Sequence, residues 1–374
     1  MKPKLIALAL IATVLAACQQ EIRLTILTGG DEHINYYGRT DFSDPQHPKQ
    51  WAAGAYFSFD FEGDFCVVNI SDEYNSNRRA NMLEVVIDNL ATQNVITKDS
   101  ITTIAIGNVP EELLQSLKGN VIRCYDSITD AKHSVTICRN TETAMGYTQV
   151  NNITAPKFPP NKAKQACGMI EFIGNSITCG AEADTTLMPG AQYQWGDWHR
   201  AYYGYGPRTA RKLGSAWSLV SVSGIGLIHS CCDMGVTMPQ VYDKYVLRYD
   251  QKPYEKRTCH PTTVCICLGQ NDGIQDSTTF CSTYVDFVKR VQAFNDNEVA
   301  RFVLLTSPMA DNDLREWQKN MLTAIAKQLE KENVGQVSTY FFSRAWNGGG
   351  VSHPSVEEHE QIANELSNYI KSIL

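Results

Sequence analysis

Basic runs, long apolar runs and repeats are all missing or scarce in this 374-residue sequence. Its 33 Lys and Arg residues are outnumbered by 40 Asp and Glu residues, and the basic residues form no run or stripe. A surface of this kind cannot neutralise a phosphate backbone, so we expect no nucleic acid partner. Beyond the first residues no stretch is apolar enough to span a bilayer. What remains is an ordinary globular composition, 43% hydrophobic and 20% charged.

Metal-ligand spacing is also missing among the twelve cysteines. The close pairs Cys231-Cys232 and Cys265-x-Cys267 are unlike a zinc site, and the second pair lies in an apolar run where buried thiols are common. Setting aside Cys18, for the reason given next, leaves an odd number that cannot all pair within the chain. We therefore expect mostly core thiols, no metal or cofactor, and no disulfide that the sequence can assign.

The first 17 residues have the layout of a secretory signal peptide, with two lysines, a short apolar run and small residues at the end. The last of these residues and the next, Leu15-Ala16-Ala17-Cys18, resemble the lipobox of bacterial lipoproteins, in which the cysteine is acylated. This resemblance implies an exported, membrane-anchored lipoprotein, periplasmic or on the cell surface, with its lipid on Cys18. The alternative is a plain secretory signal with Cys18 free.

Residues 18–150 are typical of an all-β domain, and we expect a β-sandwich of jelly-roll type. The expected strands are short, rich in β-branched and aromatic residues, and separated by Gly, Asn and Asp. One helical turn, 110–117, interrupts them. Residues 151–167 hold three prolines and almost no apolar periodicity, so we interpret them as a linker. The expected strands are 55–61, 65–70, 82–87, 101–106, 121–125 and 134–138.

From residue 168 to 374 the pattern changes to strands alternating with helices, which predicts a three-layer α/β domain with a flavodoxin-like parallel sheet. The predicted helices follow Asp276 and Asp311, and the last begins at the capping-box pattern of residues 355–358. Ligands bind such sheets beyond the carboxyl ends of the strands. The expected strands, each a near-continuous apolar run, are 169–173, 217–222, 263–268, 301–306 and 337–342.

Three short motifs carry residues suited to acyl transfer, although each alone is weak. Gly174-Asn175-Ser176 follows the first of these strands, where a sharp turn would expose a hydroxyl, but such a tripeptide is usually only a turn with a helix cap. Asn271 in Gly-Gln-Asn-Asp-Gly follows the third and could donate to an oxyanion, or simply form a turn. His353 stands in a loop before the last helix, where a lone histidine is more often a surface residue.

Together, the ordered blocks Gly-x-Ser, Ser-Gly-Ile-Gly at 223–226, Gly-x-Asn-Asp and His-Pro resemble those of the SGNH (GDSL) hydrolases. The resemblance implies that Ser176 is the nucleophile and His353 its general base. It also implies an oxyanion hole made by the backbone N–H groups of Ser176 and Gly224 and the side chain of Asn271. A serine hydroxyl needs such a base, and the oxyanion needs preplaced donors.

The sequence departs from that family at the residue that orients the histidine. An aspartate commonly precedes it by two or three residues, but Val351 and Gly350 occupy these positions. Either a backbone carbonyl or a carboxylate from elsewhere must then hold the ring, and a Ser-His dyad of this kind resembles some members of carbohydrate esterase family 2. The opening segments 34–44 and 51–63 and the helical segments 202–213 and 237–243 also resemble that family, over about nine-tenths of the mature chain.

That resemblance implies an acetyl esterase acting on acetylated polysaccharides or oligosaccharides of xylan or mannan type. Trp195, Trp198 and Trp346 could offer flat faces to sugar rings, although core packing explains such aromatics equally well. Two other functions stay open. One is a lipase, thioesterase or other SGNH acyl hydrolase, and the other is a lipid-anchored carbohydrate-binding protein on an inactive esterase scaffold, suggested by the missing acid near His353.

Overall fold

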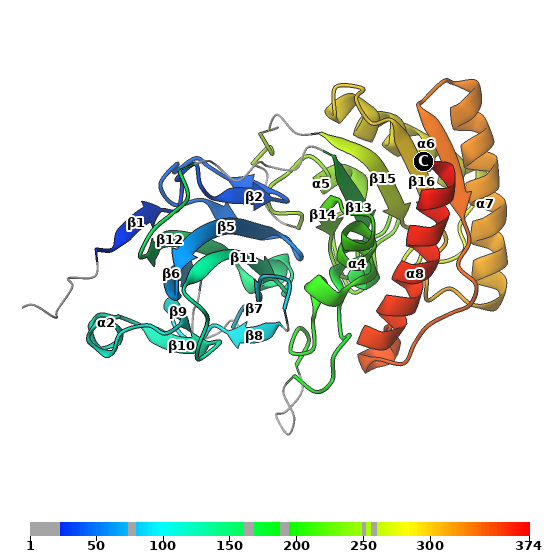
Figure 1. The fold of residues 1–374 in the computed structure, drawn as a ribbon. Coiled ribbons are helices and arrows are strands. Elements are labelled where there is room, and N and C mark those ends of the chain that lie inside the picture. The colour runs from blue at the N-terminus through cyan, green and yellow to red at the C-terminus, as the bar shows by residue number, and fades with distance from the viewer. Residues whose placement is uncertain are drawn as a thin grey trace, which may run out of the picture.

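The structure, a computed structural model, describes residues 23–73, 80–90, 92–160, 168–187, 194–248, 252–255 and 260–374. The predicted signal peptide and Cys18 lie outside these residues. Figure 1 shows the two parts of the chain side by side, strands from the N-terminal part on one side and a sheet flanked by helices on the other.

The N-terminal part holds two sheets that share one core. In the first sheet the order is β10-β9-β6-β12-β4-β3, with β1 paired to β12, and in the second it is β2-β5-β11-β7-β8. An α-helix, α2 (Glu111–Ser116), lies between β9 and β10. The strands are β1 (Thr25–Thr28), β2 (Asn35–Tyr37), β3 (Thr40–Asp41), β4 (Lys49–Gln50), β5 (Tyr56–Gly63), β6 (Phe65–Asp72), β7 (Met82–Ile87), β8 (Gln93–Ile96), β9 (Ile101–Gly107), β10 (Asn120–Cys124), β11 (Ala131–Arg139) and β12 (Thr148–Ala155).

Alternating side chains explain how these strands form a sandwich. In β5 the aromatic residues Phe57, Phe59 and Phe61 are buried while the residues between them are half-exposed, as expected when successive side chains point to opposite faces. They share a core with Val68 and Ile70 of the first sheet. Two sheets packed face to face are the all-β arrangement that the strand pattern predicted.

The predicted linker begins too early. Strand β12 includes residues 151–155, which we had assigned to the linker, and pairs with both β1 and β6. Ile153 and Ala155 are fully buried there. The neighbouring polar residues Asn151, Asn152 and Thr154 are half-exposed, as expected of a strand with one face toward solvent. The polar composition of the segment hid this alternation. Residues 161–167 of the predicted linker lie outside the described residues.

The C-terminal part is built on a five-stranded parallel sheet in the order β14-β13-β15-β16-β17. The first strand lies inside the sheet with the second and third on either side, which is the flavodoxin-like order predicted from the sequence. The strands are β13 (Met169–Gly174), β14 (Ala216–Ser221), β15 (Pro261–Cys267), β16 (Arg301–Leu305) and β17 (Gln336–Tyr340).

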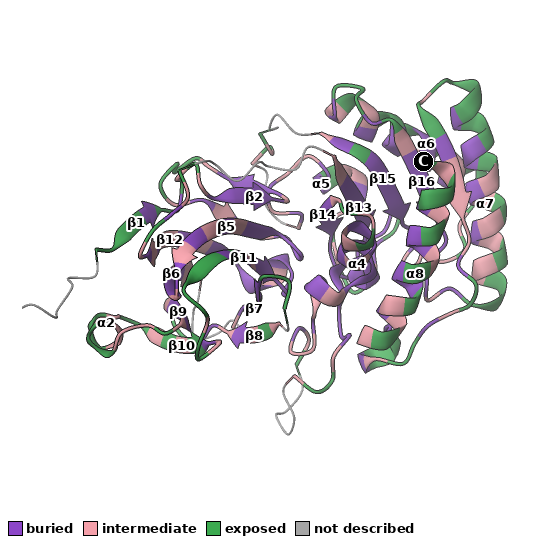
Figure 2. Cartoon of the chain, in the orientation of Figure 1, coloured by how far each residue is buried: buried purple, intermediate pink, exposed green. Residues whose placement is uncertain are grey.

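Helices cover both faces of this sheet, and Figure 2 shows their buried stripes turned toward it. Phe172 packs in a core with α4 and α8, whereas its neighbour Ile173 packs with α5, α6 and α7. Strands buried on both faces explain the near-continuous apolar runs of the sequence. The helices are α3 (Ser176–Cys179), α4 (Tyr205–Lys212), α5 (Met238–Val241), α6 (Ser277–Phe294), α7 (Asn312–Lys331) and α8 (Val356–Ile373).

The core under α4 and α8 continues into the N-terminal sandwich. Tyr56 stacks on Trp217 with ring centroids 4.0 Å apart, and Trp217 Nε1 donates to the Gly54 carbonyl at 2.9 Å. Tyr37 and Cys138 belong to the same buried cluster. The two domains are thus packed through a dry aromatic contact.

The nine cysteines of the described ranges are free thiols, and Cys265 and Cys267 are buried in β15 as predicted. In the same ranges, every helix is too short or too polar to cross a membrane.

Candidate active site

Three neighbouring strands bring the predicted motifs to one edge of the parallel sheet. Gly174 at the end of β13 is paired with Ser221 of β14 on one side and with Cys267 of β15 on the other. The chain then continues within a few residues to Ser176, Gly224 and Asn271, respectively. The carboxyl edge of the sheet at its first and third strands is where the fold places ligands.

Ser176 and His353 meet at this edge, although 177 positions separate them in the sequence. His353 Nε2 lies 2.9 Å from Ser176 Oγ, within proton-transfer reach. Ser176 is the first residue of α3, and the Asn175 side chain accepts the Ile177 N–H, which fixes the turn. Both Ser176 and His353 are 8% exposed, so the pair lies at the floor of the site.

A backbone carbonyl orients the histidine in place of the missing aspartate. His353 Nδ1 lies 3.1 Å from the Val351 carbonyl oxygen, which fixes a proton on Nδ1 and leaves Nε2 free to accept from Ser176. Val351 holds its carbonyl there in a left-handed conformation, with φ 47° and ψ 42°, which is strained for a β-branched residue. Ser352 is also left-handed, at φ 57°.

His353 is neutral at ordinary pH. Burial lowers its pKa below the usual 6.5, although the Val351 carbonyl and the Glu182 charge act in the opposite direction. An uncharged imidazole is the form that can accept a proton from Ser176.

Gly224, a predicted oxyanion donor, lies on a loop that is held by the residues following β15. We call residues 223–230 the glycine loop. Asn271 Nδ2 donates to the Ile225 carbonyl at 2.8 Å, which leaves the second N–H of the amide for another acceptor. The Asp272 carboxylate accepts the N–H groups of residues 227, 228 and 229. Gly224 has φ +85°, a conformation that glycine adopts without strain.

The structure separates the three predicted sugar-binding tryptophans. Trp195 is half-buried and meets the His353 ring edge-on, with centroids 5.5 Å apart. Trp198 is half-buried and lies against Gly350, where an added Cβ would come within 2.6 Å of its ring. The prediction for Trp346 is wrong, because this residue is 1% exposed and packs against Phe342 in the core under α8.

A buried cluster of charges behind Trp195 escaped the sequence analysis. Glu142, Glu182 and His199 are all fully buried; His199 Nε2 lies 3.4 Å from Glu142 Oε1, and its Nδ1 lies 3.1 Å from Glu182 Oε1. Burial alone would lower the pKa of His199, but the two carboxylates outweigh it and raise that pKa to about 9. Burial would likewise raise the pKa of Glu142, but His199 outweighs it and lowers that pKa to about 2. The cluster therefore carries one buried cation between two carboxylates.

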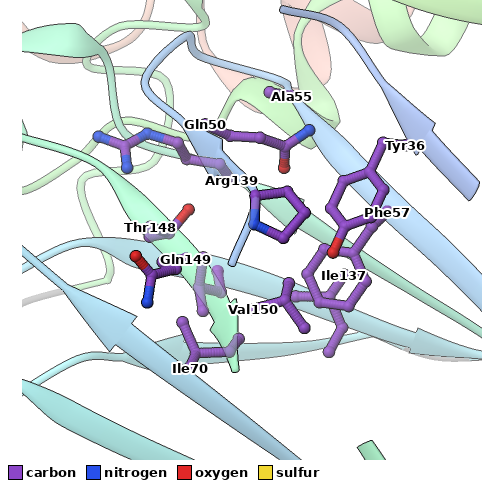
Figure 3. A pocket seen from close by; sticks show the side chains of 12 residues that line it. Tyr36, Gln50, Ala55, Phe57, Ile70, Ile137, Arg139, Thr148, Gln149 and Val150 are labelled. Atoms are coloured by element: carbon purple, nitrogen blue, oxygen red, sulfur yellow. The ribbon is translucent and has the colours of Figure 1, made fainter. Parts of the chain in front are cut away.

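In the part of the chain that the structure describes, no group of His, Cys, Asp and Glu side chains could hold a metal ion. A small pocket lies inside the N-terminal sandwich (Figure 3), between Phe57 and Ile137 of one sheet and Ile70 and Val150 of the other. Its lining includes neither Ser176 nor His353, so it is separate from the catalytic pair.

Known proteins resemble the chain over both domains. Residues 36–112 match the family "Carbohydrate esterase 2 N-terminal". The cellulase/esterase CelE of Acetivibrio thermocellus is 24% identical over 91% of this chain, which spans only 39% of that protein. An acetylxylan esterase / glucomannan deacetylase of Cellvibrio japonicus is 23% identical, covering 93% of this chain and 91% of that one.

The fold shows the same likeness. The solved structure of a family two carbohydrate esterase from Cellvibrio japonicus superposes with a TM-score of 0.77 at 22% identity, covering 94% of this chain and 98% of the other. Both the sandwich and the parallel-sheet domain therefore have counterparts in a single known protein.

Proposed function

Because this chain resembles the family two carbohydrate esterases in sequence and in fold, we propose that it is a carbohydrate O-acetyl esterase. The observation that carries the proposal is the 2.9 Å contact between Ser176 Oγ and His353 Nε2 at the carboxyl edge of the sheet. A serine within reach of a neutral imidazole, beside a loop of backbone donors, is equipped for acyl transfer.

The reaction follows from the positions of the atoms. Ser176 Oγ attacks the acetyl carbonyl carbon while His353 Nε2 takes the hydroxyl proton, and the oxygen that becomes negative is stabilised by Gly224, Asn271 and the Ser176 N–H. The C–O bond to the sugar then breaks, and His353 returns its proton to the departing hydroxyl. Water, deprotonated by the same nitrogen, attacks the carbonyl carbon of the acetyl-serine. The bond from that carbon to Ser176 Oγ then breaks, His353 returns the proton to Oγ, and acetate leaves. One oxyanion donor contributes about 3 to 4 kcal/mol of transition-state stabilisation.

The substrate we propose is acetylated xylan or mannan, as polysaccharide or oligosaccharide. Support comes from the Cellvibrio japonicus relative, an acetylxylan esterase / glucomannan deacetylase, and from Trp195, whose half-exposed ring lies beside His353. We further propose that the N-terminal sandwich is of the jelly-roll type expected from its sequence.

Acetate release from acetylated xylan and glucomannan tests this function. We expect the wild-type protein to release acetate from at least one of these two polysaccharides, and we expect Ser176→Ala to lose this activity. The alternative function, a general SGNH acyl hydrolase, is tested with esters of increasing acyl-chain length. An enzyme whose pocket fits acetate should lose activity steeply as the acyl chain grows. Equal or better turnover of long chains, or glycan binding without acetate release, would refute the proposed function.

We also propose the lipid on Cys18, and with it an exported, membrane-anchored location. The support is the sequence Leu15-Ala16-Ala17-Cys18 after an apolar run. In the bacterial host, the full chain should fractionate with membranes and the Cys18→Ser variant should not. Equal distribution of the two proteins would contradict a lipid anchor.

A further inference from the structure

The N-terminal domain reaches the active site through one loop. Residues 140–147 connect β11 with β12, both strands of the sandwich. Buried Arg139 holds the loop from inside: its guanidinium donates to the carbonyls of Thr141, Glu142 and Gly146. Figure 3 shows this arginine beside the pocket of the sandwich. These three hydrogen bonds stabilise the loop, which presents the Glu142 side chain to the other domain.

Both oxygens of the Glu142 carboxylate accept hydrogen bonds from parts of the active site. Glu142 Oε2 accepts the Ser223 N–H at 2.8 Å, directly before Gly224. Glu142 Oε1 accepts Trp195 Nε1–H at 3.0 Å and faces His199 Nε2. A buried carboxylate is stable only when it is satisfied in this way.

The same cluster reaches the loop that carries the general base. His199 binds the side chain of Glu182, and the Glu182 carbonyl accepts the Gly350 N–H at 2.8 Å, three residues before His353. Trp195 meets His353 directly. Glu142 thus contacts the glycine loop directly. It is linked to His353 through Trp195 and also through His199 and Glu182.

We propose that Glu142 is a positioning residue for this site, supplied by the N-terminal sandwich, which fixes the glycine loop and Trp195 at the same time. The inference rests on the proposed esterase function. It gives the sandwich a part in the reaction, because the carboxylate that accepts the Ser223 N–H belongs to the sandwich. Misplacing a catalytic group by about 1 Å can reduce the rate about a hundredfold.

Glu142→Gln is the informative change because it keeps the size and removes the charge. Each carboxylate oxygen accepts from N–H donors, so the amide must turn its NH2 toward Ser223 on one side or toward Trp195 and His199 on the other. We expect kcat for acetate release to fall about ten- to a hundredfold with KM nearly unchanged, since the lost contacts serve the transition state and not substrate binding.

Glu84→Gln is the matched control. Glu84 is also a fully buried carboxylate of the sandwich at the domain interface, but it pairs with Arg200 and Asn140. Both variants lose a buried charge, so thermal unfolding shows the general effect on stability. If Glu84→Gln lowers kcat as much as Glu142→Gln, or if Glu142→Gln changes KM alone, the positioning role is refuted.

Trp195→Phe tests the same proposal if Glu142→Gln does not fold. It keeps an aromatic ring beside His353 but removes the N–H donated to Glu142, together with part of the indole ring. We expect a lower kcat, and unchanged kcat would overturn the proposal. Wild-type protein and Ser176→Ala are measured in the same series: a wild type without serine-dependent acetate release refutes the esterase itself, whereas an active wild type with an equally active Glu142→Gln refutes only the positioning role.

Discussion

Three buried histidines of this chain have different protonation states because their surroundings differ. His199 lies between two carboxylates and is held as a cation. His359, in α8, has no such partner; burial lowers its pKa to about 3, and its Nδ1 accepts the Tyr205 N–H. His353 lies between these extremes and is the one in contact with a hydroxyl. The burial and the charges around each histidine therefore set its protonation state, and only His353 combines a neutral imidazole with a nearby hydroxyl.

The pH dependence of kcat/KM should therefore report His353. Its folded pKa is lowered, so the imidazole loses its proton below pH 6.5, and activity should rise with pH and reach its plateau with a midpoint below 6.5. The charged groups that act on it are Glu182, which raises its pKa, and His199, which stays protonated over this range. Acetate release from a neutral ester between about pH 4 and pH 8 measures the midpoint. A midpoint above 6.5 would contradict burial as the dominant influence.

At the residue level, the sequence analysis predicted that Ser176 and His353 meet, but it missed the buried charges that lie behind them. Ser176 and His353 stand in short motifs next to recognisable strand and helix ends, and the order of these motifs, which resembles that of the SGNH hydrolases, located them. Glu142 and His199 are ordinary polar residues in loops, and only the packing of two domains makes them neighbours. The prediction for Trp346 was wrong because it relied on nearness to His353 in the sequence, whereas packing buries this ring in the core.

Among the elements, the loop before α8 carries the departure from the SGNH pattern. Three glycines, 348–350, are followed by Val351, which is left-handed and 58% exposed. Its side chain has little to pack against, so its contribution to the site is the carbonyl that accepts from His353.

Substitutions of Val351 separate the backbone from the side chain. Val351→Gly can keep φ 47° and should leave kcat nearly unchanged. Val351→Pro fixes φ near −65°, removes the carbonyl from His353 and should lower kcat between about a hundredfold and ten thousandfold. Steady-state kinetics of the two variants, each checked for unchanged thermal unfolding, decide the matter. Equal activity of both would show that another group orients the ring.

Elements with strong periodicity were predicted well. The five parallel strands and helices α6, α7 and α8 lie within a few residues of their expected bounds, and the Ser355 capping box is present. The short strands β1 to β4, and β12 with its wet face, were missed because two to eight polar-rich residues carry too little pattern. Their pairing is decided by partners distant in sequence.

On the scale of the whole molecule, the two domains form one functional unit. An aromatic contact around Trp217 joins their cores, and the Glu142 loop crosses the interface to the glycine loop. Because the site is assembled from both domains, it depends on how the sandwich packs against the parallel-sheet domain. The N-terminal domain therefore contributes to the proposed reaction.

The central claim is that Ser176 and His353 act together, and a double-mutant cycle on acetate release tests it most directly. Residues that act as a unit are not additive: removing either should abolish most of the rate, and removing both should cost little more. The account predicts that Ser176→Ala, His353→Ala and the double variant have nearly the same residual kcat/KM. Losses that multiply in the double variant, or substantial activity in Ser176→Ala, would contradict it.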